Sequence, residues 1–563
     1  MVVFNKQSFL GGFNQQVDAT RLEDSEYPLM FNGRNRYDYI KPINLPLEIT
    51  DAAFTGKKLQ GIYSIGSVLI VFANGEAWYK NQELPNSYFN QIPDVAMSAT
   101  ADIIYAELIP VSSANFTRVP ITSNQQNTDI ILVNPITASP SGLIVQDNLN
   151  QPIIILSNLT ARTLATYNDW SYADREYVPI GGQMLYSDGK LYIVSGSYIY
   201  QSVTGRPLDF VVVLDGDGNK LATEAMGGAL ATAFSVDFNQ ITCISRLNTN
   251  EANIFVSTSK AAYTVALLTQ PQDLIFGEPD FEIRFLFTTG CTSPFSFLEL
   301  LGDNALIDFN GLRSFNAVGQ LYIEGKNSVF SAKVGPLLNS VVQDYTAAIN
   351  FDNYAFFAVN TVYGRGIIVY DTINKVYVSL DLYPGISQVI KFEEVRTLTE
   401  RRLFFITTDN KIYEAFKSEE VAICKLYVGD WCSNDANIEL KPWQLKLVFV
   451  DSLQDGTVTA SIYSDRRFNG SLSSEISQKL LDANDSNLVL SIGNSAVDTV
   501  QIVDFDFTKK GLIGWKHGFL ISWNIDAKLT HIKFSAVEDV NISAANQQAS
   551  RFKQNKVALN NLT

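Results

Sequence analysis

The residues with the clearest potential for chemistry are two histidines and three adjacent carboxylate pairs. They are His517 and His531, with Glu393-Glu394, Glu419-Glu420 and Glu538-Asp539. The histidines lack the partner pattern of a catalytic or metal site, so we expect them to lie on strand surfaces or to hydrogen-bond locally. Paired carboxylates can cleave a glycosidic bond by acid–base chemistry. These pairs are more typical of solvated loop charge, and the sequence leaves a glycosidase pair open as an alternative.

Three short motifs begin like known sites, and each departs from the pattern that it resembles. Gly364-Arg365-Gly366 opens like a dinucleotide fingerprint, but the third glycine is missing and a strand is expected where a helix must start. Residues 215–219 open like a calcium loop, but Lys220 and Met226 occupy the positions of the required Gly and Glu. Ser187-Asp188-Gly189 is the nearest fragment of a sialidase turn, and it is not repeated. All three motifs predict tight turns, with an adventitious cation site at 215–219 as the alternative.

The sequence predicts no catalytic, cofactor-binding or metal-binding residue, and therefore a protein that is not an enzyme and has no cofactor. The four cysteines are too sparse to hold together a chain of this length, and we expect reduced, mostly buried thiols; they are Cys243, Cys291, Cys424 and Cys432. Neither a signal peptide nor an apolar run of the ~18–20 residues that span a membrane is visible. We expect synthesis in a cytoplasm and no membrane anchor.

The composition of the chain limits its class. It has 563 residues, with 42 Lys and Arg against 58 Asp and Glu, a net charge of −16. Apolar residues make up 46% and charged residues 18%, a composition typical of a folded globular protein rather than a disordered one. We expect two to four domains from the length. An acidic chain is not expected to bind nucleic acid through its phosphates, because phosphate binding needs clustered Lys and Arg.

Short runs rich in Val, Ile, Phe and Tyr, bounded by Gly, Asn, Asp and Ser, predict an all-β fold. Hairpins are expected from strands at 59–63, 68–72 and 77–79; at 183–186, 191–194 and 197–201; at 253–258 and 262–266; at 305–309 and 313–315; at 354–359, 366–371 and 376–380; and at 403–407 and 411–416. These units recur every ~40–50 residues, the period of a propeller blade. We therefore predict an irregular β-propeller of six or seven blades over residues 56–420, with an irregular insertion around 93–170.

Beyond about residue 420 the pattern changes to longer strands that alternate well. They are expected at 444–450, 457–463, 519–525 and 531–537, and four of the six tryptophans lie there. These features predict a separate C-terminal β-sandwich over 421–541. Residues 1–55 are expected to form an N-terminal strap and 542–563 a polar tail. The first 420 residues carry 28 basic and 43 acidic residues, a net of −15, so the acidity belongs almost wholly to the predicted propeller.

Several segments together resemble a known family. The N-terminal one contains Gly11-Gly12, Asn14 and Asp18, and then Asn32 followed by Arg34. The whole set of segments is 9–22, 26–36, 202–210, 290–296, 308–315, 367–371, 456–463 and 518–523. In these segments the chain resembles the tail nozzle proteins (tail-tube or tail-stabilisation proteins) of short-tailed bacteriophages. The likeness spans most of the chain, although each motif is short.

The resemblance implies a structural protein of the virion tail, made in the cytoplasm of a host bacterium. It implies that the protein assembles with itself as a ring, typically of six copies, below the portal and next to an upstream adaptor or ring protein. Tail fibres or spikes are further implied partners. Such a ring retains the packaged genome and conducts DNA during ejection. Acidic walls would repel phosphates and let DNA pass without tight binding. The alternative is that the acidity serves only to keep the protein soluble.

Two other functions stay open on the sequence. One is a different tail or baseplate component, either a ring protein or a host adhesin. The other, from a different class, is a glycan-binding or carbohydrate-active propeller, which would need a cleft with carboxylates and aromatic side chains.

Overall fold

The computed structural model describes most of the chain. The described residues are 1–16, 18–84, 87–110, 141–164, 178–202, 205, 207–208, 210, 232–247, 254–268, 280–300, 303–309, 311–314, 332–338, 341–344, 346–432, 439–450, 456–465, 467–476, 500–508 and 513–539. Over these residues the fold is nearly all β. The described helices, η1 (Ala19–Arg21), η2 (Ala52–Phe54), η4 (Ala332–Val334) and α2 (Gly335–Leu338), are single turns, and none could cross a bilayer.

Seven small antiparallel sheets follow one another along the described part of residues 47–414. The first three contain β8 (Leu59–Ile65), β9 (Val68–Ala73), β10 (Glu76–Asn81) and β11 (Asn90–Ile92); β12 (Tyr105–Pro110), β13 (Ser141–Gln146), β14 (Ile153–Leu156) and β15 (Ala161–Thr163); and β16 (Met184–Ser187), β17 (Lys190–Ser195), β18 (Tyr198–Gln201) and β19 (Thr232–Ser235). The next two contain β20 (Ile241–Arg246), β21 (Ile254–Thr258), β22 (Ala262–Leu268) and β23 (Asp280–Phe287); and β24 (Phe297–Leu300), β25 (Asp303–Asp308) and β26 (Gly311–Ser314).

The sixth and seventh sheets include strands from the N-terminal segment. The sixth contains β27 (Ala347–Phe351), β28 (Tyr354–Thr361), β29 (Gly364–Asp371) and β30 (Val376–Asp381), and β30 continues into β4 (Leu29–Phe31). The seventh contains β31 (Val389–Arg396), β32 (Arg401–Thr407) and β33 (Ile412–Glu414), and its fourth strand is β7 (Leu47–Glu48). Residues before the first sheet therefore complete the last one.

The turns within these sheets have the backbone that the sequence predicts. The pairs Asn74-Gly75 and Asp188-Gly189 both have positive φ angles, 49° and 79° in the first pair and 52° and 77° in the second. Two successive positive φ angles define the type I′ turn, which matches the twist of the strands that it joins. The hairpins β9–β10 and β16–β17 are confirmed at the predicted turns.

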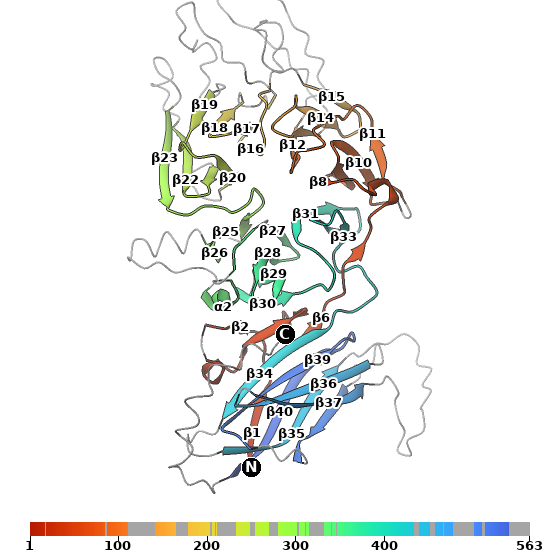
Figure 1. Cartoon of the computed structure of the whole chain (residues 1–563), viewed down its shortest axis with the longest axis vertical. Helices are drawn as coiled ribbons and strands as arrows, with labels where there is room; N and C mark the ends of the chain where they lie inside the picture. Colours follow the sequence, from red (N-terminus) through yellow and green to blue (C-terminus); the bar gives the residue numbers. More distant parts are fainter. Residues whose placement is uncertain are drawn as a thin grey trace, which may run out of the picture.

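The first strands of the seven sheets lie beside one another in chain order, and β31 of the seventh lies beside β8 of the first. Separate hydrophobic clusters fill five of the spaces between neighbouring sheets, and one large cluster, shared with the C-terminal strands, fills the spaces on both sides of the sixth sheet. Both faces of each sheet are therefore covered, which explains why strands such as β9 are continuous apolar runs rather than alternating ones. Figure 1 shows the small sheets together in the upper part of the molecule.

The region 93–170, where the sequence predicts an irregular insertion, contains the sheet β12–β15 in its described part. The pairing of β12 with β13, and of β13 with β14, is as regular as in the neighbouring sheets. Residues 111–140, which connect β12 to β13, and residues 165–170 lie outside the described residues.

The long C-terminal strands form two layers. One sheet contains β1 (Val2–Lys6), β40 (Lys528–Asp539), β35 (Glu439–Val450) and β38 (Val500–Asp506). The other joins β34 (Cys424–Cys432), β39 (Lys516–Trp523), β36 (Gly456–Ser464) and β37 (Arg467–Ile476) to β4. Their inner faces meet through aromatic pairs, including Phe519–Phe534 with ring centroids 4.9 Å apart and Phe449–Trp523 at 5.6 Å. The tail at 542–563 lies outside the described residues.

Candidate functional site: the N-terminal junction and the central cavity

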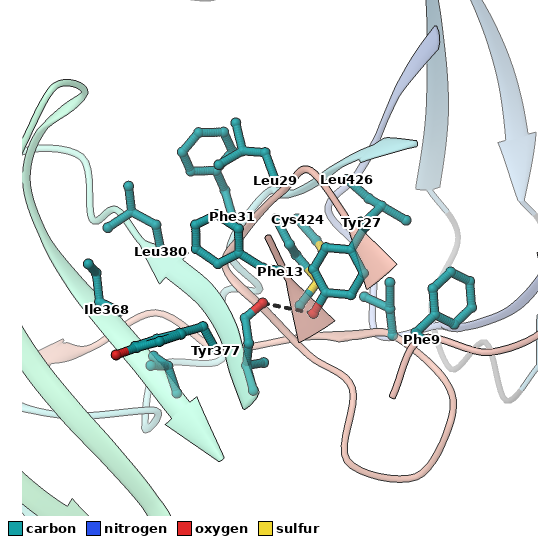
Figure 2. Close-up of a cluster of buried hydrophobic side chains, with 14 of the residues drawn as sticks. Phe9, Phe13, Tyr27, Leu29, Phe31, Ile368, Tyr377, Leu380, Cys424 and Leu426 are labelled. Carbon is teal, nitrogen blue, oxygen red and sulfur yellow. Dashed lines mark hydrogen bonds between the residues drawn. The ribbon is translucent and has the colours of Figure 1, made fainter. Parts of the chain in front are cut away.

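The N-terminal segment docks between the sixth sheet and the C-terminal sheets, at a place that we call the N-terminal junction (residues 9–36 with β30 and β34). Phe9, Phe13 and Tyr27 are completely buried there. Figure 2 shows these side chains packed with residues of β30 and β34. The Tyr27 hydroxyl donates a hydrogen bond of 2.9 Å to the carbonyl of Val378 in β30.

Strand β4 joins the two parts of the molecule through backbone hydrogen bonding. It pairs in parallel with β30, with Phe31 opposite Leu380. Its other edge pairs with β34 in antiparallel register, with Met30 opposite Leu426. A three-residue strand thus fuses the sixth sheet and one C-terminal sheet into a single sheet of nine strands. Because ladder hydrogen bonds run along both of its edges, β4 stabilises the relative position of the two parts.

Ionic contacts reinforce this junction. The Arg34 guanidinium pairs with the completely buried Asp381 carboxylate through both of its terminal nitrogens, at 3.0 and 2.6 Å. The Arg36 guanidinium lies 3.8 Å from the centroid of the Tyr354 ring. A bidentate pair of this kind adds directional specificity to charge attraction. Arg34 and Arg36 therefore bind the N-terminal segment to β28 and β30 in one orientation.

A second ionic contact involves the buried Glu26 of β3 (Glu26–Tyr27). Lys333 Nζ lies 2.7 Å from Glu26 Oε1, and Asn14 Nδ2 donates to both carboxylate oxygens at 3.1 Å. Burial opposes ionisation of Glu26, but the hydrogen bonds from Lys333 and Asn14 outweigh it, so the pKa of Glu26 is lowered. Asn14 is part of the segment that carries the family resemblance, and its role here is to position a charge.

A central cavity of about 350 Å³ lies where the first strands of the small sheets converge. It is lined from β8, β12, β16, β20 and β31, with Phe295 from the segment before β24. Gln183, just before β16, is one of its polar lining residues, and it binds across to the next sheet. Its amide nitrogen donates to the carbonyls of Ile244 and Pro294, and its amide oxygen accepts from the N–H of Ile244.

Three charged side chains line this cavity. Lys391 and Glu393 lie two residues apart on β31 and so share one face, where Lys391 Nζ is 2.8 Å from Glu393 Oε2. Glu393 also accepts a 2.7 Å hydrogen bond from Ser64 of β8. Glu107 of β12 accepts a 3.0 Å hydrogen bond from the N–H of Tyr186.

Burial perturbs two of these groups. The pKa of Lys391 is lowered because desolvation penalises the ammonium more than Glu393 and Glu107 favour it. Desolvation raises the pKa of Glu107 to about 7, against the opposing effects of the Tyr186 N–H and Lys391. Sequence reasoning missed Lys391 and Glu107, because they lie on strands of different sheets and only the tertiary fold brings them together.

The histidines differ from each other in their surroundings. His531 is exposed on β40 and contacts the adjacent Thr530, as expected. His517 is completely buried, so the expectation of a surface or local position is wrong for it. Its Nδ1 lies 2.8 Å from Oγ of Ser464, the residue opposite it on the neighbouring β36, and its Nε2 lies 2.8 Å from the carbonyl of Leu440 on β35 in the other sheet. Burial is the main cause that lowers the pKa of His517.

The carboxylate pairs are not all loop charge. Glu419-Glu420 is exposed outside the strands, as expected. Glu393-Glu394 lies on β31 and Glu538-Asp539 ends β40, so the loop expectation is wrong for both. The side chain of Glu394 is paired with Arg396 and Arg401. The Glu393 partner is Lys391, so the two adjacent carboxylates have separate roles.

The remaining sequence features are a hairpin turn, four free cysteines and a motif that lies outside the described residues. Gly364 begins β29 with a φ of 101°, so a hairpin strand follows it as predicted. Residues 215–219, Lys220 and Met226 lie outside the described residues. All four cysteines are free thiols, and three of them are buried, which confirms the prediction. Within the described ranges, no group of three or more His, Cys, Asp or Glu could hold a metal ion.

Comparisons with known proteins give little. No protein-family model and no curated protein matches the chain. A chain from the structure of S. cerevisiae Dbp5 bound to Nup159, Gle1, IP6 and ADP is similar at 9% identity and a TM-score of 0.33, covering 69% of this chain and 97% of that one. A chain from the complex of BBS1N with ARL6DN is similar at 12% identity and a TM-score of 0.34, covering 67% and 98%. Likenesses this weak carry no argument about function.

Proposed function

We propose that this chain is a structural protein of a short-tailed bacteriophage tail, which forms a ring-shaped nozzle that retains the packaged genome and conducts DNA during ejection. The observation that carries the proposal is the N-terminal junction. The segment with the strongest family resemblance is buried between two bodies of β-structure and provides Phe13, Tyr27 and Arg34 to hold them together. A segment whose side chains are used in this way supports an architectural role rather than a catalytic one.

The proposal includes a seven-bladed β-propeller followed by a C-terminal β-sandwich. Seven consecutive sheets whose first strands adjoin in order, with β31 beside β8, support the propeller. The strand β7 in the seventh sheet supports closure, because a strand from the start of the chain then joins the last blade to the first. Two facing sheets with an aromatic core support the sandwich.

The charge distribution supports passage of DNA without binding. The first 420 residues carry a net charge of −15, and the remainder carries −1. Negative charge along a conduit repels phosphates at short range and is screened beyond about 8–10 Å at physiological salt. The ring is proposed to contain six copies, to adjoin an upstream adaptor in the virion, and to carry tail fibres or spikes.

The mass of the purified protein in solution, with negative-stain images at high concentration, tests the ring. We expect closed rings, either alone or after addition of the protein that precedes it in the tail. A strict monomer under both conditions would contradict the proposal. Filter binding with duplex DNA at moderate salt tests the conduit, for which we expect weak or no retention. Tight binding would contradict a conduit even if rings form.

A further inference from the structure

The central cavity contains a carboxylate, that of Glu107, which forms no direct ion pair with a described Lys or Arg. Lys391 is already engaged. Its ammonium group pairs with Glu393 and donates to the carbonyl of Ile62, and it lies 3.6 Å from the centroid of the Tyr63 ring and 5.6 Å from that of Phe295. No described Lys or Arg forms an ion pair with Glu107. Arg246, on the neighbouring β20, is directed to Ser187 and the carbonyl of Tyr186 instead. Glu107 therefore accepts one backbone hydrogen bond, and Lys391 and Arg246 act on its charge without a direct ion pair.

Aromatic rings lie beside this carboxylate. Tyr105 and Glu107 are two residues apart on β12, so they project from the same face of the strand, and both line the cavity. Phe295 approaches Tyr105 with ring centroids 6.3 Å apart and a tilt of 38°. Aromatic faces attract cations through their quadrupole, and they do so most strongly where water is excluded. The Tyr105 ring, on the same strand face as Glu107, suits an ammonium group, whereas the Phe295 ring is shared with Lys391, whose Nζ lies 5.6 Å from its centroid.

We propose that the central cavity is a binding site for a small organic cation with a primary ammonium group, held by the Glu107 carboxylate against Tyr105 and Phe295. The volume of about 350 Å³ is at the small end of the range for ligand sites, which suits a molecule of this size. A bare metal ion fits less well, because the described residues provide no cluster of three ligating side chains. This site is separate from the proposed ring function and does not depend on it.

Protonation of Glu107 controls the affinity. Burial raises the pKa of Glu107 to about 7, and the other groups that act on it are Lys391 and Glu393 from β31, Arg246 from β20 and the N–H of Tyr186 from β16. Only the ionised carboxylate attracts an ammonium ion, and the bound ion in turn favours ionisation. Binding is therefore stronger at pH 8 than at pH 6, and near pH 6.5 it releases a proton from Glu107.

Isothermal titration of the purified full-length chain with benzylamine, and with benzyl alcohol as the neutral analogue, tests the site. We expect benzylamine to bind at pH 8, at least tenfold more weakly at pH 6, and benzyl alcohol to show no comparable affinity. Titration near pH 6.5 in two buffers of different ionisation enthalpy should reveal the released proton. No binding of benzylamine at 10 mM, or equal binding of the two compounds, overturns the proposal.

Two variants locate the site. Glu107→Gln keeps the shape and removes the charge, and we expect at least a tenfold loss of benzylamine affinity. Glu419→Gln removes a charge from an exposed loop and should leave the affinity unchanged. Unchanged binding in Glu107→Gln overturns the assignment. If that variant does not fold, Tyr105→Leu should weaken benzylamine binding by several fold. An unchanged affinity in Tyr105→Leu would also overturn the assignment. Ring formation enters none of these measurements.

Discussion

The Arg34 guanidinium and the Asp381 carboxylate form a bidentate ion pair across the N-terminal junction, with Nη2 2.6 Å from Oδ2 and Nη1 3.0 Å from Oδ1. Asp381 is completely buried, and its partner Arg34 lies 347 residues earlier in the sequence. Because a buried carboxylate without a counterion is costly, this contact couples the N-terminal segment to β30.

Replacement of Arg34 tests that coupling. We expect Arg34→Ala to lower the free energy of unfolding by about 3–5 kcal/mol, because Asp381 would keep its burial and lose its counterion. The urea midpoint followed by tryptophan fluorescence measures the effect. Lys58→Ala is the control: it breaks the Lys58–Asp102 ion pair, whose side chains are 42% and 93% exposed, and should change stability by less than ~1 kcal/mol. Equal effects from the two variants would contradict the proposed role of Arg34.

The Tyr27 hydroxyl gives a second prediction. It donates to the carbonyl of Val378 and accepts from Asn35 Nδ2 at 3.1 Å, on a side chain that is completely buried. Tyr27→Phe leaves both partners without this hydroxyl and should cost about 1–3 kcal/mol. Tyr37→Phe removes a hydroxyl from a residue that is 71% exposed, and we expect a change near zero. Thermal unfolding of both variants beside the parent protein decides the point.

Gly12 and Gly56 have the same left-handed backbone conformation but differ in how closely other atoms surround them. Their φ angles are 76° and 73°, so alanine at either site has the strain of a left-handed backbone, about 1–2 kcal/mol. A Cβ at Gly12 would lie 2.5 Å from the carbonyl oxygen of Tyr377 and 2.7 Å from Val376 Cβ, whereas one at Gly56 meets nothing within 4 Å. Gly12→Ala should therefore destabilise the protein clearly more than Gly56→Ala. A similar urea midpoint for the two would show that β2 (Gly12–Phe13) does not pack closely on β30 in solution.

His517 gives a prediction about pH. Because burial holds its pKa below 6.5, the unfolded chain binds a proton at this residue before the folded one does. The stability contributed by neutral His517 is thus complete above about pH 6.5 and is lost as the pH falls through the folded pKa. His517→Gln should be less pH-sensitive than the parent protein between pH 7 and pH 5, and His531→Gln should not. Urea midpoints at several pH values measure this, and identical pH profiles for the two variants would refute it.

The sequence predicted those parts of the fold that local chemistry determines. Turns such as Asn74-Gly75 and the long alternating strands beyond residue 420 lie where their patterns indicate. The strands β1, β4 and β7 were missed, because two to five residues with no turn signal carry no information about a partner hundreds of residues away. Their positions depend on tertiary pairing, which overrides local propensity.

The candidate sites were predictable to different degrees. The N-terminal segment was singled out by its motifs, although its burial between two sheets could not be derived from them. The cavity was not predicted at all, since Glu107 and Lys391 come from strands in different sheets and each has an ordinary local context. His517 was expected on a strand surface or in a local hydrogen bond, because a lone histidine in an alternating strand does not reveal which face is inward.

The strand β7 has a consequence for how this chain is made. Its partner, β33, is synthesised more than three hundred residues later. The separation in sequence between β1 and its partner β40 is longer still. During translation both N-terminal strands therefore leave the ribosome with unpaired edges, which are prone to pair with other chains. The pairing of β7 with β33 is therefore a late step, and contacts of such long range form slowly. A nascent chain arrested before residue 412 should hence be sensitive to protease and dependent on chaperones, although most of its sheets already exist.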